Sequence, residues 1–168
     1  MSDKLSKPSG FNLTISTRAL LYKIAAFLRV KRTKAIIKLF EILFEELIND
    51  REFRAYCDAW DKSQRHFDDS DKSSYTSFYI PQDYMKKFED VMYDFGFIDR
   101  SPFLRLIIDY VYNHRVSPME ENVIPKIKKD IEGLGYKIEH IGPILDGKVY
   151  IYIDNPSKKT RRKKSGTK

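Results

Sequence analysis

Cysteine and long apolar runs are scarce in this chain of 168 residues, whose single thiol is Cys57. One thiol excludes an internal disulfide framework and a cluster of thiolate metal ligands. The N-terminus lacks the apolar segment of a signal peptide, and no stretch approaches the roughly 18 apolar residues that span a bilayer. We therefore expect a soluble, cytoplasmic protein.

Motifs of catalytic and metal sites are also missing from the sequence. It contains no P-loop, GxGxxG, HExxH or CxxC motif. The three histidines, His66, His114 and His140, lack the spacing of metal ligands. We therefore predict that the protein is not an enzyme and that it uses neither a metal nor a cofactor.

Positive charge is concentrated in two segments of the chain, whose formal net charge is +7. The segment after Pro156 contains no acidic residue and supplies this excess through Lys158, Lys159, Arg161, Arg162, Lys163, Lys164 and Lys168. Residues 16–38 carry seven further basic residues and no acidic one. Such clusters favour a polyanionic partner, with nucleic acid first and an anionic membrane surface second.

A pattern of strand, helix, polar turn and helix occurs twice in the sequence. In the first copy, alternation predicts a strand with one buried face, formed by Phe11, Leu13 and Ile15, and one polar face, formed by Asn12, Thr14 and Ser16. An amphipathic helix follows, then the basic turn RVKRTK. Thr33 is the predicted N-cap of a second helix with the apolar face Ile36, Leu39, Phe40 and Leu43.

The second copy begins with a strand in which Phe78 and Ile80 alternate with Ser77 and Tyr79. Its first helix stops at Gly96, and Ser101 is the predicted N-cap of the second, with Pro102 at the first helical position. The strands align at an offset of 65 residues, the first helices at 64 and the second helices at 68. Because a short strand is unstable alone, we predict that the two strands pair with each other.

The two copies resemble the ribbon-helix-helix DNA-binding regulators of the MetJ and Arc type. The resemblance rests on NLTIS, RALLYKIAAFL, RTK and AIIKLFEILFEEL in residues 11–49, and on SFYIP, DYMKKFEDVMYDFGF, RSP and FLRLIIDYVYNH in residues 76–114. The chain looks like a tandem member, a variety found among regulators of archaeal viruses and accessory proteins of conjugative plasmids; a viral member would act in the cytoplasm of the host cell. The resemblance implies a mainly α fold with short β, in which two ribbon-helix-helix units form an intramolecular pseudo-dimer.

The resemblance also implies a sequence-specific transcription regulator, such as a repressor, that reads the major groove of double-stranded DNA with a two-stranded antiparallel ribbon. The implied base-reading residues are Asn12, Thr14, Ser16, Ser77 and Tyr79, and the implied phosphate-binding residues are Arg18, Arg32, Thr33, Lys34, Arg100 and Ser101. The alternatives at these positions are a solvated sheet face and ordinary helix capping. The functional alternatives are an architectural or relaxosome-type accessory protein with weak sequence preference, and a protein-interaction module.

The sequence departs from the family pattern in two respects. Neither polar strand face carries Arg, Lys or Gln, which are frequent base readers. Residues 76–111 contain four basic and six acidic residues, so we expect the second copy to contribute less to DNA affinity. Because the two strand faces differ, the DNA site is expected to be non-palindromic.

The remaining segments complete the predicted organisation. Residues 1–10 are expected to be flexible, and residues 50–75 to form a helical connection, with Phe53, Tyr56, Cys57 and Trp60 on one face, and a polar linker. Residues 115–155 are expected to form a helix and a β-hairpin, which either cover the bundle or pair chains into a homo-oligomer. Residues 156–168 read as a disordered tail that contacts DNA nonspecifically or keeps the protein soluble; the candidate contacts are Lys158, Lys159, Arg161, Arg162, Lys163 and Lys164.

Overall fold

The computed structural model describes residues 6–60, 72–141 and 150–154. The chain divides into two compact units, Met1–Val116 and Ser117–Lys168. Helices predominate, with one short two-stranded sheet in the first unit and a small hairpin in the second, so the predicted mainly α class with short β is confirmed. Within the described ranges, no helix combines the length and the apolar character needed to cross a bilayer.

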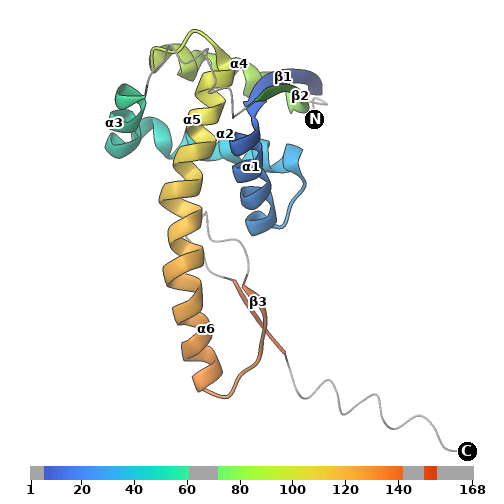
Figure 1. Ribbon diagram of the computed structural model, residues 1–168, viewed down its shortest axis with the longest axis vertical. Coiled ribbons are helices and arrows are strands. Elements are labelled where there is room, and N and C mark those ends of the chain that lie inside the picture. Colours follow the sequence, from blue (N-terminus) through green and yellow to red (C-terminus); the bar gives the residue numbers. More distant parts are fainter. Residues whose placement is uncertain (1–5, 61–71, 142–149, 155–168) are drawn as a thin grey trace, which may run out of the picture. The chain divides into compact units, whose positions relative to one another are not determined.

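The first unit repeats the order of strand, helix and helix (Figure 1). Its elements are β1 (Ser6–Thr14), α1 (Ile15–Leu28), α2 (Arg32–Glu45), the 3₁₀-helix η1 (Leu47–Asn49), α3 (Arg51–Ala59), β2 (Ser73–Pro81), α4 (Gln82–Asp94), α5 (Arg100–Val111) and the π-helical turn η2 (Tyr112–Val116). The strands pair with each other in antiparallel orientation, as the sequence predicted.

The strands differ in extent from the prediction, which placed the first at residues 11–16 and expected residues 1–10 to be flexible. β1 begins at Ser6, so residues 6–10 belong to the strand, while residues 1–5 lie outside the described residues. β1 ends at Thr14 because this side chain caps α1: its Oγ1 accepts a hydrogen bond from the backbone N–H of Thr17 at 3.1 Å. Ile15, predicted to be buried in the strand, is instead the first residue of α1 and is 53% exposed. β2 begins at Ser73, so residues 73–75 belong to this strand and not to the predicted linker; residues 61–71 lie outside the described residues.

One aromatic core joins the two sequence copies. Phe88 in α4 is fully buried and stacks on Phe40 of α2, with ring centroids 4.4 Å apart. The same ring makes an edge contact with Phe11 of β1 at 6.1 Å and packs against Phe103 of α5 at 5.3 Å. Because each copy supplies two of these four rings, the two copies share this core.

Helix α5 lies at the centre of the unit. Its buried residues are Pro102, Phe103, Leu104, Arg105, Leu106, Ile107, Ile108, Tyr110 and Val111. A helix that is buried on nearly every side is typical of the middle of a bundle. The predicted helical connection forms α3, whose Phe53 packs against Tyr110 with centroids 5.0 Å apart. On the same face, Cys57 is buried and Tyr56 donates a hydrogen bond to the carboxylate of Asp109.

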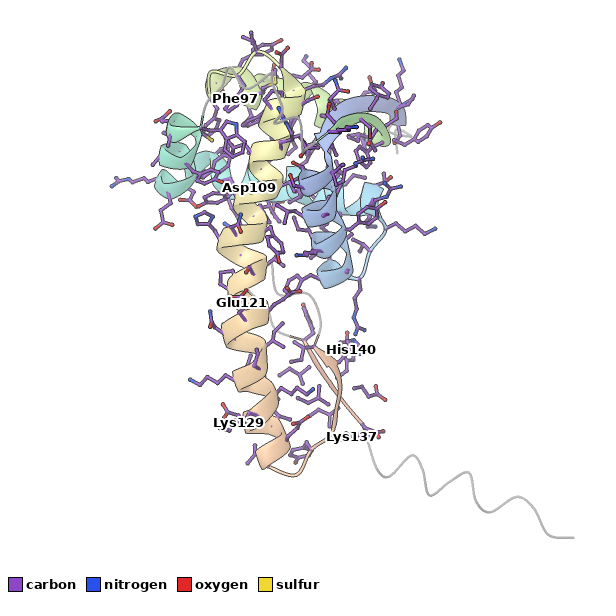
Figure 2. The ribbon with its side chains drawn as sticks, viewed as in Figure 1. Phe97, Asp109, Glu121, Lys129, Lys137 and His140 are labelled. Carbon is purple, nitrogen blue, oxygen red and sulfur yellow. The ribbon has the colours of Figure 1, made fainter. Side chains whose placement is uncertain are left out.

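The second unit contains a π-helical turn η3 (Met119–Val123), α6 (Ile124–Gly133), and the antiparallel strands β3 (Ile138–Ile141) and β4 (Ile151–Ile153). The predicted helix and hairpin are therefore confirmed for the residues described. His140 stacks on Tyr152 across the hairpin at 4.0 Å, and Figure 2 labels His140 on β3. None of the described residues of this unit is buried within the chain.

Candidate nucleic-acid interface

The β1–β2 ribbon has a buried face and an exposed face. Phe11, Leu13, Phe78 and Ile80 are at most 3% exposed and point toward the helices. On the opposite face, Asn12 pairs with Tyr75, Gly10 with Ser77, and Pro8 with Tyr79. Tyr75 and Tyr79 are 71% and 64% exposed. The exposed face therefore presents hydroxyl and amide groups on a paired ribbon, and we call it the outer ribbon face.

The register of the ribbon is symmetric about the pair Gly10 and Ser77. Each of these residues lies five positions before the first residue of the following helix, Ile15 or Gln82. By strand register and by the starts of the first helices, the two copies therefore correspond at an offset of 67 residues, so the sequence alignments at 65 and 64 were wrong. The second helices, which begin at Arg32 and Arg100, keep the predicted offset of 68.

Three of the five predicted base-reading residues lie on the outer ribbon face: Asn12, Ser77 and Tyr79 are exposed there. Thr14 and Ser16 do not lie on it. Thr14 is 4% exposed, and its Oγ1 is 2.8 Å from the hydroxyl oxygen of Thr17, because it is the cap of α1. Ser16 belongs to the first turn of α1.

Tyr75 is a member of this face that the sequence reasoning missed. Its ring lies across Gly10, where an added β-carbon would be 1.8 Å from the tyrosine hydroxyl oxygen. Gly10 thus provides the space that lets the ring lie flat on the ribbon. The alternation of Ser77 and Tyr79, continued two residues toward the N-terminus, would have identified Tyr75.

The second helices begin differently from the prediction. Lys31 and Asp99 occupy the N-cap positions of α2 and α5, and neither side chain bonds to the first turn. The predicted caps Thr33 and Ser101 are each the second residue of their helix, and Pro102 is the third residue of α5. These cap assignments were therefore wrong by two residues.

Ser101 has a different partner, which links α5 to the ribbon. Its hydroxyl oxygen accepts a hydrogen bond from the backbone N–H of Asn12 at 2.9 Å. The adjacent Arg100 places its guanidinium 5.7 Å from the ring centroid of Phe11 and 3.9 Å from the carboxylate of Glu89. The start of α5 is therefore held beside the edge of β1.

A cluster of basic residues surrounds the start of α2. Lys31, Arg32 and Lys34 are exposed, Thr33 is half-buried, and the guanidinium of Arg32 lies 5.0 Å from the ring centroid of Tyr22. A hollow of about 560 Å³ lies at this turn, lined by Tyr22, Ala25, Ala26, Val30, Lys31, Arg32 and Thr33. Arg18, on the first turn of α1, is half-buried.

The tail residues Lys158, Lys159, Arg161, Arg162, Lys163 and Lys164 lie outside the described residues. In the part of the chain that the structure describes, no group of three or more His, Cys, Asp or Glu side chains is placed to hold a metal ion.

Comparisons of the chain with models of protein families, with curated proteins and with solved structures gave no match.

Proposed function

We propose that the first unit is a tandem ribbon-helix-helix module that binds the major groove of double-stranded DNA and regulates transcription. The observation that carries the proposal is the symmetric register about Gly10 and Ser77, with each strand followed by two helices. A ribbon-helix-helix dimer places two identical strands about a two-fold axis. In this chain one polypeptide would supply both halves.

The outer ribbon face has the chemistry of a base-reading surface. A two-stranded ribbon fits the major groove, where an asparagine amide pairs with adenine and a hydroxyl group hydrogen-bonds several base edges. Asn12 supplies the amide, and Ser77, Tyr75 and Tyr79 supply hydroxyl groups. In the symmetric register Asn12 corresponds to Tyr79, so the two half-sites would carry different bases.

Phosphate contacts would come from the starts of α2 and α5. The N-terminus of a helix attracts anions through its backbone N–H groups and the helix dipole. Arg32 and Lys34 add positive charge at α2, and Arg100 adds it at α5. Because residues 16–38 contain no acidic residue, the first copy would supply most of the backbone affinity.

One observation favours a second candidate, an accessory protein that coats DNA with weak sequence preference. The described outer ribbon face carries no Arg, Lys or Gln, so it lacks the bidentate contacts to guanine that are the commonest specific contacts in protein–DNA complexes. Such a protein would bind most duplexes with similar affinity.

Selection of bound duplexes from a random library, followed by gel-shift titration at two salt concentrations, tests the proposal. We expect one enriched non-palindromic motif, bound more tightly than scrambled DNA and more weakly at the higher salt concentration. Uniform binding of all duplexes would support the accessory protein instead. Absence of duplex binding at either salt concentration would overturn both and leave a protein-interaction module.

A further inference from the structure

The turn between α1 and α2 forms a basic, hollowed corner. We define the basic corner as Tyr22, Val30, Lys31 and Arg32 with the hollow of about 560 Å³ that these residues help to line. Its rim is positive, because Lys31 and Arg32 are exposed, and its walls include the apolar side chains Ala25, Ala26 and Val30. Tyr22 is 53% exposed, so apolar surface remains open to solvent there.

The corresponding turn of the second copy, between α4 and α5, has the opposite character. We define the acidic corner as Asp90, Tyr93, Asp94, Ile98 and Asp99. Tyr93 and Ile98 are 61% and 70% exposed, so this corner projects large apolar side chains. Asp90 and Asp94 are exposed and lie one helical turn apart on α4, next to Tyr93.

Two backbone hydrogen bonds close the turn of the acidic corner just before Ile98. Gly96 adopts a φ of 81°, and its N–H donates to the carbonyl of Tyr93 at 2.9 Å. The next N–H, that of Phe97, donates to the carbonyl of Met92 at 3.0 Å. These bonds close the turn, and Phe97 is buried there. Figure 2 labels Phe97 at the end of α5 that lies away from Asp109. Ile98 follows directly after this closed turn and is exposed.

We propose that the acidic corner of one copy of this chain binds the basic corner of a second copy. Charge is complementary, because Asp90, Asp94 and Asp99 would face Lys31 and Arg32. In a row of chains Arg32 would therefore face the neighbouring chain, and the exposed Lys34 would supply the phosphate contact at α2. Shape is complementary as well, since Tyr93 and Ile98 project while the basic corner is hollowed. In a dimer of two identical ribbon-helix-helix chains, the two corresponding turns would carry the same charge, so turns of neighbouring dimers would repel each other. In this chain the two sequence copies differ in charge, so a positive turn can meet a negative one.

The contact cannot close within one chain. Figure 1 shows the α1–α2 turn and the α4–α5 turn on opposite sides of the first unit. Each chain therefore donates one corner and receives another, which is a heterologous, open-ended contact. Rows of chains side by side would bind neighbouring DNA sites cooperatively. That consequence rests on the proposed DNA-binding function, whereas the contact itself does not require DNA.

Sedimentation equilibrium of the full chain without DNA tests the contact. We expect the average mass to rise above 19.9 kDa with increasing concentration at low salt, and less steeply at high salt. The double variant D90K/D94K carries two basic corners, and the double variant K31E/R32E carries two acidic corners. Each variant alone is expected to remain a monomer, and their equimolar mixture is expected to regain association, with alternating chains.

Mixing the two variants distinguishes the pairing of corners from misfolding and from a contact elsewhere in the chain. A misfolded variant would show altered circular dichroism and would not regain association in the mixture. A monomeric wild-type chain at low salt would overturn the proposal. So would association that survives in both separate variants, which would place the contact elsewhere, for instance in the second unit. If only D90K/D94K lost association, the acidic corner would bind some other basic segment, and the proposed pairing of corners would be wrong.

DNA-binding measurements with one-site and two-site duplexes distinguish the contact between chains from the proposed DNA-binding function. We expect D90K/D94K to bind a duplex with one selected site at least as tightly as the wild type, and to lose cooperativity on a duplex with two adjacent sites. Retained cooperativity in this variant would overturn the contact while leaving DNA binding intact. Conversely, association that is lost in each variant and regained in their mixture, without any DNA binding, would uphold the contact and overturn the proposed function.

Discussion

The backbone N–H of Asn12 donates to the hydroxyl oxygen of Ser101 across 2.9 Å, and this bond joins the strand of one sequence copy to the second helix of the other. It fixes the edge of the ribbon beside the start of α5. If the ribbon enters a DNA groove, the same bond sets the height of that helix above the phosphates. Under the proposed function, one hydroxyl group would therefore have both a structural role and a positioning role.

Replacing Ser101 with Ala removes the acceptor for the Asn12 N–H. We expect the free energy of unfolding to fall by about 0.5–1.5 kcal/mol, at the lower end because water can reach this exposed group. Urea denaturation measures the change. The matched control is Ser101→Thr, which keeps the hydroxyl group and should stay close to the wild type. Equal losses in both variants would show that the bond contributes nothing.

Replacing Asn12 with Ala removes the only amide of the outer ribbon face, within the described residues, without disturbing the buried face. We expect discrimination between selected and scrambled duplex to fall by about 1–3 kcal/mol, the value of a bidentate base contact. Gel-shift titration of both duplexes measures it. Asn113→Ala, an exposed amide on η2, is the control and should leave discrimination unchanged. Equal weakening on both duplexes would instead indicate a backbone or folding effect.

Replacing Gly10 with Ala should displace the ring of Tyr75. The added β-carbon would lie 1.8 Å from the tyrosine hydroxyl oxygen, and this side chain is exposed and free to swing outward. We therefore expect a change in DNA discrimination with little change in stability. Tyr75→Ala should have a similar effect on discrimination, and the double variant should be no worse than either single variant, because both act through the same ring. Additive losses would contradict this coupling.

Replacing Phe88 with Ala should destabilise both sequence copies together. Its ring contacts Phe40, Phe11 and Phe103, so its loss opens a cavity among three elements and should lower the free energy of unfolding by about 3–5 kcal/mol. Urea denaturation followed by circular dichroism and by tyrosine fluorescence should give one coincident transition. Tyr79→Ala, at a site 64% exposed, is the control. Two separate transitions would show that each copy folds alone.

Periodicity predicted the elements of the fold well and their junctions poorly. The inward-facing positions Phe11, Leu13, Phe78 and Ile80 were predictable, because alternation of apolar and polar residues depends on burial alone. The end of β1 was not, since Thr14 continues the alternation and also caps α1. Side-chain hydrogen bonds across 89 residues, such as that of Ser101, leave no local pattern in the sequence. Thr14 and Ser16 were therefore placed wrongly on the polar strand face, and Tyr75, which does lie there, was missed.

The stability of the first unit should fall at alkaline pH through Tyr110 and Tyr56. Burial and the carboxylate of Asp50, whose Oδ2 is 3.3 Å from the Tyr110 hydroxyl oxygen, raise the pKa of Tyr110 to about 12. Burial and the hydrogen bond to Asp109 likewise raise the pKa of Tyr56.

An unfolded tyrosine has a pKa near 10, so between pH 10 and 12 the unfolded chain loses protons that the folded chain retains. The stabilisation from these protons is therefore complete below about pH 10 and is lost as the pH rises toward the folded pKa. Urea denaturation across this range should show a falling free energy of unfolding, with a shallower slope for Tyr110→Phe, which has no proton to lose. An identical slope in that variant would mean that the Tyr110 phenol titrates normally and that its contact with Asp50 does not persist in solution.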